Sequence, residues 1–249
     1  MTYCLGIKLK SGIVGIADTR ITSGYETAKA KKVFTINKDK HSLFIMTSGL
    51  RSVRDKALTY FMEVIEEEDE TFNKLYKAVN AFARQVRKAA DEDKAALKES
   101  GLNFNLFAIV GGQLQDDKEH KLYLLYPEGN WIEVTEGSPF AIIGNNGYGK
   151  PILDRVIKYD STMEFALKAG FLSFDATRIS ANDVDFPIDV VYSKKDSFRI
   201  TEKRYKKEEL QEIIKFWDKR LSESINNIPD EWIDKITSKD EINLQDLSS

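Results

Sequence analysis

The first eighteen residues, MTYCLGIKLKSGIVGIAD, predict how the chain begins to fold. Between residues 2 and 10, the apolar side chains at 3, 5, 7 and 9 alternate with the side chains at 2, 4, 6 and 8. This period of two is typical of a β-strand. Ser11 and Gly12 are turn residues, and the run from Ile13 to Asp18 has β-strand character. The stretch therefore predicts a β-hairpin whose first strand starts at residue 2.

The rest of the chain separates into blocks of strands and pairs of helices. Apolar residues spaced three and four apart predict a long amphipathic helix at 71–90. The acidic run at 66–70 is expected to be the loop before it. This order favours an α+β fold with antiparallel sheets over a regular βαβ alternation. We expect the other helices at 51–66, 149–159, 161–176 and 206–224, and further strands at 32–37, 42–47, 103–111, 121–126, 131–135, 140–144, 188–193 and 197–201.

The composition excludes several classes of protein. Of the 249 residues, 42% are hydrophobic and 11% aromatic, which is enough to bury a core and excludes a wholly disordered chain. The formal net charge of −3 gives no basic excess of the kind that favours nucleic-acid binding. No apolar run approaches the ~18 residues of a membrane span, and the N-terminus lacks a signal-peptide pattern. We therefore expect a cytoplasmic protein with no nucleic-acid or membrane partner.

Histidine and cysteine are scarce. His41 and His120 leave little room for a histidine-rich zinc site or a Ser-His-Asp triad, and their polar neighbours place both in exposed loops. Cys4 is the single cysteine and is expected to be a small buried residue. Enzymatic proton transfer would therefore use a group other than imidazole, and we expect neither a metal nor a cofactor.

Residues 144–151 read GNNGYGKP and match most of a phosphate-binding loop. The spacing of Gly144, Gly149 and Lys150 fits, as do the predicted strand before them and the helix after them. The next position should carry a hydroxyl for magnesium, but Pro151 stands there. We therefore favour a glycine-rich turn between a strand and a helix, which can shape a nearby active site, and keep nucleotide binding as an alternative.

Thr2 becomes the first residue if Met1 is removed, as methionine normally is before a small residue. A threonine hydroxyl needs an adjacent base before it can act as a nucleophile. The freed α-amine has a pKa of about 8 and can serve as that base. One residue then supplies both groups without any histidine, so Thr2 is a candidate N-terminal nucleophile.

Several short motifs follow Thr2 in a particular order. IADTR at 16–20 ends the second predicted strand, KKVF at 31–34 begins the next, and SGL at 48–50 leads into the first helix. With IGNNGYGKPILDR at 143–155 and FPIDVV at 186–191, this order resembles a proteasome-type N-terminal-nucleophile hydrolase. The resemblance spans residues 2 to about 201. Within the family, this sequence is most similar to the bacterial proteins of the ancestral β-subunit type.

The resemblance implies roles for four residues. Thr2 corresponds to the nucleophile, and Asp18 and Lys32 to the family's acid and lysine. A lysine near the threonine hydroxyl would lower its pKa, and an aspartate would keep that lysine charged and oriented. The backbone N–H of Gly49 corresponds to the donor that stabilises the oxyanion.

Other family positions match less closely. The later aspartate and serine of the family map to Asp175 and Ser180, with Asp183 as a competitor for the aspartate role. The family's Gly-Ser-Gly-Ser turn is replaced by GNNG at 144–147, so its hydroxyl groups are absent. The residues implied as walls of a modest substrate pocket without charge preference are Ile21, Ala30 and Thr47.

The resemblance also implies the architecture and the partners. We expect a four-layer αββα sandwich over residues 1–204, with a C-terminal helix and tail at 205–249 packed on or beside it. The chain would self-associate into a large homo-oligomer, either a ring or an open helical or lock-washer arrangement, and act on a peptide or amide. A non-catalytic assembly subunit is the alternative, since the hydroxyl groups of the 144–147 turn are missing. The sequence does not tell whether the assembly has a partner ATPase.

Overall fold

A computed structural model of the chain describes residues 2–23, 26–68 and 72–236. The chain divides into two compact units, residues 1–207 and residues 208–249. The second unit contains nearly all of α5 (Lys207–Asn226), whose described apolar side chains are mostly exposed. Within the described ranges, no helix has both the length and the apolar character that crossing a bilayer requires.

The first unit is built around two sheets in which every strand is antiparallel to its neighbours. One sheet has the order β10 (Phe140–Gly144), β1 (Tyr3–Leu9), β2 (Gly12–Asp18), β11 (Ile188–Lys194) and β12 (Thr201–Tyr205). The other has the order β5 (Val33–Lys38), β6 (His41–Gly49), β7 (Leu106–Gln113), β8 (Lys121–Leu125) and β9 (Trp131–Glu133). A separate hairpin pairs β3 (Arg20–Ser23) with β4 (Glu26–Lys29).

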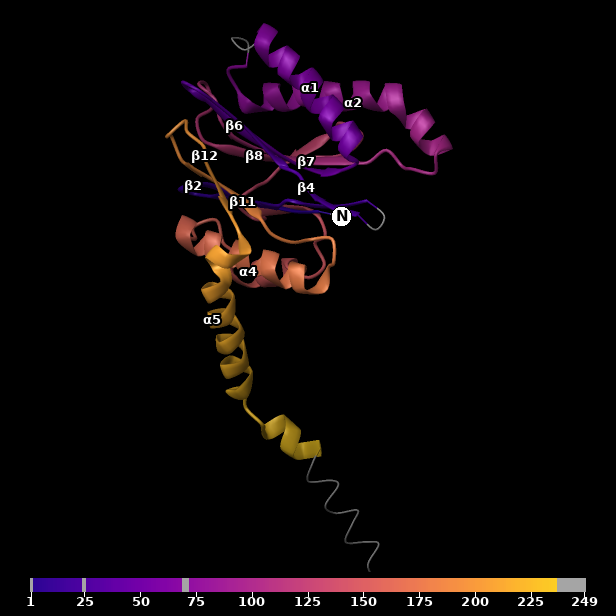
Figure 1. Cartoon of the computed structure of the whole chain (residues 1–249). Coiled ribbons are helices and arrows are strands. Elements are labelled where there is room, and N and C mark those ends of the chain that lie inside the picture. The colour runs from indigo at the N-terminus through magenta and orange to yellow at the C-terminus, as the bar shows by residue number, and fades with distance from the viewer. Residues whose placement is uncertain (1, 24–25, 69–71, 237–249) are drawn as a thin grey trace, which may run out of the picture. The chain divides into compact units, whose positions relative to one another are not determined.

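Helices cover both outer faces of the sheet pair. The apolar faces of α1 (Arg51–Glu68) and α2 (Leu75–Glu99) form one core with the β5–β9 sheet. A second apolar cluster lies between the two sheets. On the far side, α4 (Met163–Ser180) packs on β1 and β2, next to the short α3 (Lys150–Val156). Figure 1 shows the resulting order of helices, sheet, sheet and helices, which confirms the predicted α+β sandwich.

Both faces of β1 are buried. Cys4 belongs to the cluster between the sheets, and a side chain at Gly6 would meet Ile109 of the opposite sheet. The neighbouring Tyr3 points the other way and packs edge-on against Phe174 of α4. The alternation in the sequence therefore separates two different apolar layers rather than a core from solvent.

Several predicted boundaries were wrong. The strand expected at 197–201 lies at 201–205 instead, because Asp196 and Phe198 adopt positive φ angles of 58° and 46° and form a turn. The helix expected at 71–90 continues to Glu99, and α1 includes residues 66–68 of the acidic run, since glutamate is a good helix former. Residues 69–71 lie outside the described residues, and the β3–β4 hairpin was not predicted.

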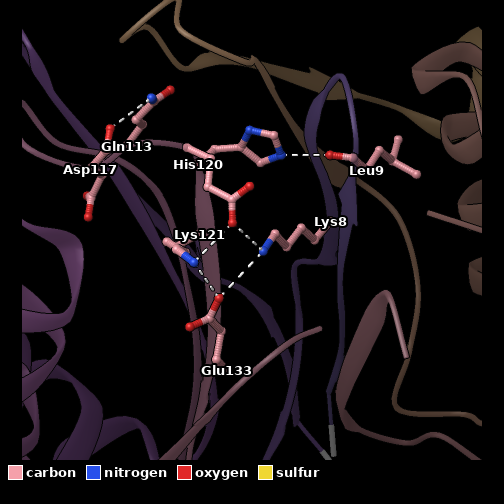
Figure 2. A network of polar contacts seen from close by, with 8 residues as sticks. Lys8, Leu9, Gln113, Asp117, His120, Lys121 and Glu133 are labelled. Carbon is pink, nitrogen blue, oxygen red and sulfur yellow. Dashed lines mark hydrogen bonds and ion pairs between the residues drawn. The ribbon is translucent and has the colours of Figure 1, made fainter. Parts of the chain in front are cut away.

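His120 was expected in an exposed loop and is instead 1% exposed. Its Nε2 atom lies 2.7 Å from the carbonyl oxygen of Leu9 at the end of β1. Figure 2 shows the ring directed at that carbonyl, beside the buried ammonium group of Lys8, which reaches the carboxylate of Glu133. The sequence neighbours Glu119 and Lys121 pair with each other, and Glu119 also pairs with Lys8 of the other sheet, so they do not expose the imidazole.

Candidate active site

The centre of the candidate site is a buried ion pair between the two sheets. Asp18 is the last residue of β2, and Lys32 immediately precedes β5. The Nζ atom of Lys32 lies 2.7 Å from Oδ1 of Asp18, with side-chain exposures of 3% and 0%. The structure thus brings together two residues that were predicted to share one site.

The Asp18 carboxylate also binds the backbone at the start of β1. Its Oδ1 accepts the Tyr3 N–H at 2.8 Å, and its Oδ2 accepts the Arg20 N–H at 3.0 Å. Burial raises the pKa of the Asp18 carboxyl, while the Lys32 ammonium and these backbone donors oppose the rise. Since Tyr3 is bonded to Thr2, the same carboxylate orients the lysine and fixes the chain next to the candidate nucleophile.

Thr2 is held by the glycine-rich turn after β10. Thr2 is 6% exposed, and its carbonyl oxygen accepts the Asn145 N–H at 2.7 Å. Gly144 has a φ of +88°, and a Cβ atom there would lie 1.9 Å from the Thr2 oxygen. Glycine is therefore required for this close approach of the two backbones.

The lysine of the same turn is already paired. The Nζ atom of Lys150 lies 2.7 Å from both carboxylate oxygens of Asp154, one helical turn further along α3. Pro151 occupies the first turn of that helix, where its missing N–H is harmless. A Cβ atom at Gly149 would lie 2.3 Å from the Ser173 oxygen, so this glycine serves the close packing of α3 on α4.

The main chain around Lys32 has two further tethers. The Thr47 N–H donates to the Lys32 carbonyl oxygen at 3.2 Å, and the Arg54 guanidinium donates to the Lys31 carbonyl oxygen at 3.4 Å. The Cys4 thiol donates to the Thr47 carbonyl oxygen at 3.7 Å. The predicted pocket residue Thr47 is therefore a direct neighbour of the lysine.

The other predicted pocket residues flank the β3–β4 hairpin. Ile21 lies on β3 and is half-buried, and Ala30 follows β4 and is also half-buried. The Ala30 N–H donates to the Thr19 carbonyl oxygen at 2.8 Å, which closes the base of the hairpin beside Asp18.

Gly49, the predicted oxyanion donor, is the last residue of β6. Its φ is +138°, and a Cβ atom there would lie 1.9 Å from the Asn105 carbonyl oxygen. Gly49 is exposed, unlike the preceding residues of the strand. An exposed backbone at a position that only glycine tolerates is compatible with the predicted role.

The structure does not bring Asp175 and Ser180 to the ion pair through any described contact. Asp175 is buried in α4, where its Oδ1 accepts from Nη2 and Nε of Arg178 at 2.6 and 3.0 Å. Ser180 is exposed at the end of that helix. Asp183 is half-buried in the following turn.

Sequence reasoning missed residues that support the site from outside. Arg54 looks like an ordinary surface residue of α1, yet it is 9% exposed and binds the chain before Lys32. The Tyr3 hydroxyl donates to the Ser173 hydroxyl at 2.6 Å, which ties the start of β1 to α4. Their partners are 23 and 170 residues away in the sequence, so no local signal indicated them.

The described residues contain no group of three or more potential metal ligands. The candidate site combines an N-terminal strand with a buried acid–lysine pair, in a sandwich of two antiparallel sheets between helices. This arrangement defines the N-terminal-nucleophile type of fold found in proteasome subunits. The chain belongs to the proteasome family, because the family model for a proteasome subunit matches residues 2–185.

Several solved structures of Anbu, an ancestral β-subunit, are similar to this chain. An Anbu (Gly-1) mutant from Hyphomicrobium sp. strain MC1 is 31% identical, with a TM-score of 0.83, and the match covers 92% of this chain and 98% of that one. Anbu from Yersinia bercovieri is 25% identical, with a TM-score of 0.85 and coverages of 91% and 97%. The helical assembly of the Anbu complex from Pseudomonas aeruginosa contains a chain that is 27% identical, with a TM-score of 0.85 and the same coverages. No curated protein matches the chain.

Proposed function

We propose that this protein is a proteasome-like threonine hydrolase that uses Thr2, after removal of Met1, to cleave a peptide or amide bond. One observation carries the proposal. A single oxygen of Asp18 accepts both the Lys32 ammonium and the Tyr3 N–H, so the acid, the lysine and the residue bonded to Thr2 meet at one atom. This arrangement supports the proposal, because a threonine hydroxyl needs activating groups held close to it.

The proposed reaction has two steps. The Thr2 hydroxyl gives its proton to the Thr2 α-amine, directly or through a water, and its oxygen attacks the substrate carbonyl. The Gly49 N–H stabilises the oxyanion, the C–N bond breaks, and the leaving amine takes the proton. Water then attacks the acyl ester, which releases the acid and restores Thr2. The Lys32 ammonium lowers the pKa of the hydroxyl, and Asp18 keeps the ammonium in place.

We also propose that the protein acts as a homo-oligomer. The Anbu complex from Pseudomonas aeruginosa is described as a helical assembly, and 91% of this chain superimposes on its subunit. Analytical ultracentrifugation or electron microscopy of the purified protein should show a large species, whereas a monomer at micromolar concentration would contradict the proposal.

The function is tested by mass spectrometry of the intact protein. The purified chain should lack Met1, and incubation with a peptide epoxyketone should add one inhibitor mass at residue 2. Thr2→Ala should abolish the adduct without changing the unfolding transition, and Thr2→Ser should retain a slower reaction. Equal labelling of Thr2→Ala would refute the mechanism.

The alternative is a non-catalytic assembly subunit. Two observations favour it: Asp175 is bound to Arg178, and the 144–147 turn carries no hydroxyl. A protein that retains Met1, resists the epoxyketone and still assembles would support this alternative. Nucleotide binding by residues 144–150 is less favoured, because Asp154 already occupies Lys150. Calorimetric ATP binding that disappears in Lys150→Ala would revive it.

A further inference from the structure

The segment from Phe198 to Tyr205 lies beyond the region matched by the family model, which ends at residue 185. It is nevertheless joined to the hairpin of β5 and β6 by a line of polar contacts. The Ser42 hydroxyl donates to the Phe198 carbonyl oxygen, and Asn37 exchanges two hydrogen bonds of 2.8 and 3.0 Å with the backbone of Ile200. These contacts tie one edge of the first sheet to the edge of the second.

Glu202 extends this line to the residues on either side of Lys32. Its Oε1 lies 2.6 Å from the Lys31 ammonium, and its Oε2 accepts from the Thr35 hydroxyl at 3.1 Å. The carboxylate thus bridges residues 31 and 35. Lys32 lies before the first residue of β5 and is joined to β6 by the bond from the Thr47 N–H, so contacts of its neighbours with other elements add to its restraint.

Arg204, on the same strand β12, binds the neighbouring strand β11. Its guanidinium makes two bonds, of 2.6 and 2.8 Å, to the fully buried carboxylate of Asp189. Asp189 is directly opposite Ala17, the residue before Asp18, in the β2–β11 register. Since Glu202 and Arg204 are two residues apart, they project from the same face of β12. One strand therefore contacts Lys31, the residue before Lys32, and Asp189, which pairs with the residue before Asp18.

We infer that Glu202 is a positioning residue for Lys32, held in place by the Arg204–Asp189 pair. The inference rests on the proposed function of Thr2. It adds a residue outside the family match that acts through Lys31 and Thr35 on the distance between the Lys32 ammonium and its partners. A displacement of about 1 Å in such a group can lower a reaction rate by up to ~100-fold.

The test compares Glu202→Gln with a matched control, Glu92→Gln. Glu92 of α2 makes the same kind of ion pair, 2.7 Å from the ammonium of Lys56, on the helical layer. Epoxyketone inactivation is measured over a range of inhibitor concentrations. Glu202→Gln should lower the maximal inactivation rate about 5- to 50-fold and leave the inhibitor concentration for half-maximal rate unchanged. Its unfolding midpoint should equal that of Glu92→Gln.

A double-mutant cycle shows whether the effect passes through Lys31. Lys31→Gln should reproduce the loss, and the Lys31→Gln/Glu202→Gln double variant should be no slower than either single variant. Additive losses, or a loss confined to the half-maximal concentration, would overturn the inference. So would an equal loss in Glu92→Gln.

Hydrogen exchange keeps the inference separate from the function of Thr2. The peptide covering residues 30–36 should exchange faster in Glu202→Gln than in the native chain or in Glu92→Gln. If the native chain is not labelled at Thr2, the proposed function fails, but faster exchange still supports positioning of the Lys32 segment. Unchanged exchange would overturn the inference whether or not Thr2 reacts.

Discussion

The Lys32 ammonium lies 2.7 Å from the Asp18 carboxylate, and neither side chain is more than 3% exposed. The two residues are 14 positions apart in the sequence: Asp18 ends a strand of one sheet, and Lys32 precedes the first strand of the other. A buried pair of this kind is sensitive to the loss of one partner, because the other charge is then left without compensation in a medium of low polarity.

Lys32→Met should abolish labelling of Thr2 and lower the free energy of unfolding by about 3 kcal/mol, because it leaves Asp18 buried without its cation. Adding Asp18→Asn to this variant should recover part of the stability but none of the reactivity. Urea unfolding and epoxyketone labelling measure the two effects separately. Recovery of labelling in the double variant would contradict the role of the pair.

Gly144→Ala should disrupt the contact between Thr2 and the turn. The left-handed backbone at Gly144 and a Cβ atom 1.9 Å from the Thr2 oxygen require the turn to move, with an expected loss of more than about 1 kcal/mol and of most labelling. Gly137→Ala is the control, since no atom lies within 4 Å of the Cβ position there. Similar behaviour of both variants in unfolding and labelling would refute the requirement for glycine at 144.

Cys4 should not react with iodoacetamide in the native protein. Burial raises the pKa of its thiol, so the reactive thiolate is scarce as well as inaccessible. Unfolding in urea should expose one equivalent of thiol, measured by mass. Stoichiometric alkylation under native conditions would show that the space between the sheets is open, and electrophile adducts could then not be assigned to Thr2 by mass alone.

His120 should make the fold sensitive to mild acid. Its Nε2 faces a carbonyl oxygen that can only accept, so the neutral ring carries its proton there, and Nδ1 has no partner within the described chain (Figure 2). Burial lowers the pKa of the ring, as does Lys8, while the bond to Leu9 and Glu119 oppose the change. Because the folded-state pKa is depressed, stability is full above about pH 6.5 and falls as the pH drops from there toward the folded pKa.

The loss amounts to about 1.4 kcal/mol for each unit by which folding lowers the pKa of His120. His120→Gln keeps a donor for the Leu9 oxygen but cannot gain a proton, so its free energy of unfolding should change less between pH 7.5 and 5.5. His41→Gln, at the start of β6, is the matched control substitution. Identical urea titrations for the native chain and His120→Gln would show that His120 is not the titrating group.

The opening hairpin, the helix pairs and the candidates Thr2, Asp18 and Lys32 could be predicted from the sequence, because strand and helix periods are local and the motifs stand in a set order. Contacts between distant residues could not. The Tyr3 hydroxyl, for example, donates to the Ser173 hydroxyl, 170 residues further along the chain. His120 has charged neighbours in the sequence, yet it is buried because the opposite sheet supplies the carbonyl of Leu9.

The order of the elements and the threonine at the start of the first strand could be read from local sequence patterns. Which face of β1 meets which layer depends on the folded structure, since all seven of its residues are buried and periodicity cannot distinguish two apolar neighbours. The folded chain also brings Glu202 of β12 to Lys31, the residue before Lys32. The physical reason is that register and layer packing place such partners together, and neither is encoded in a local pattern.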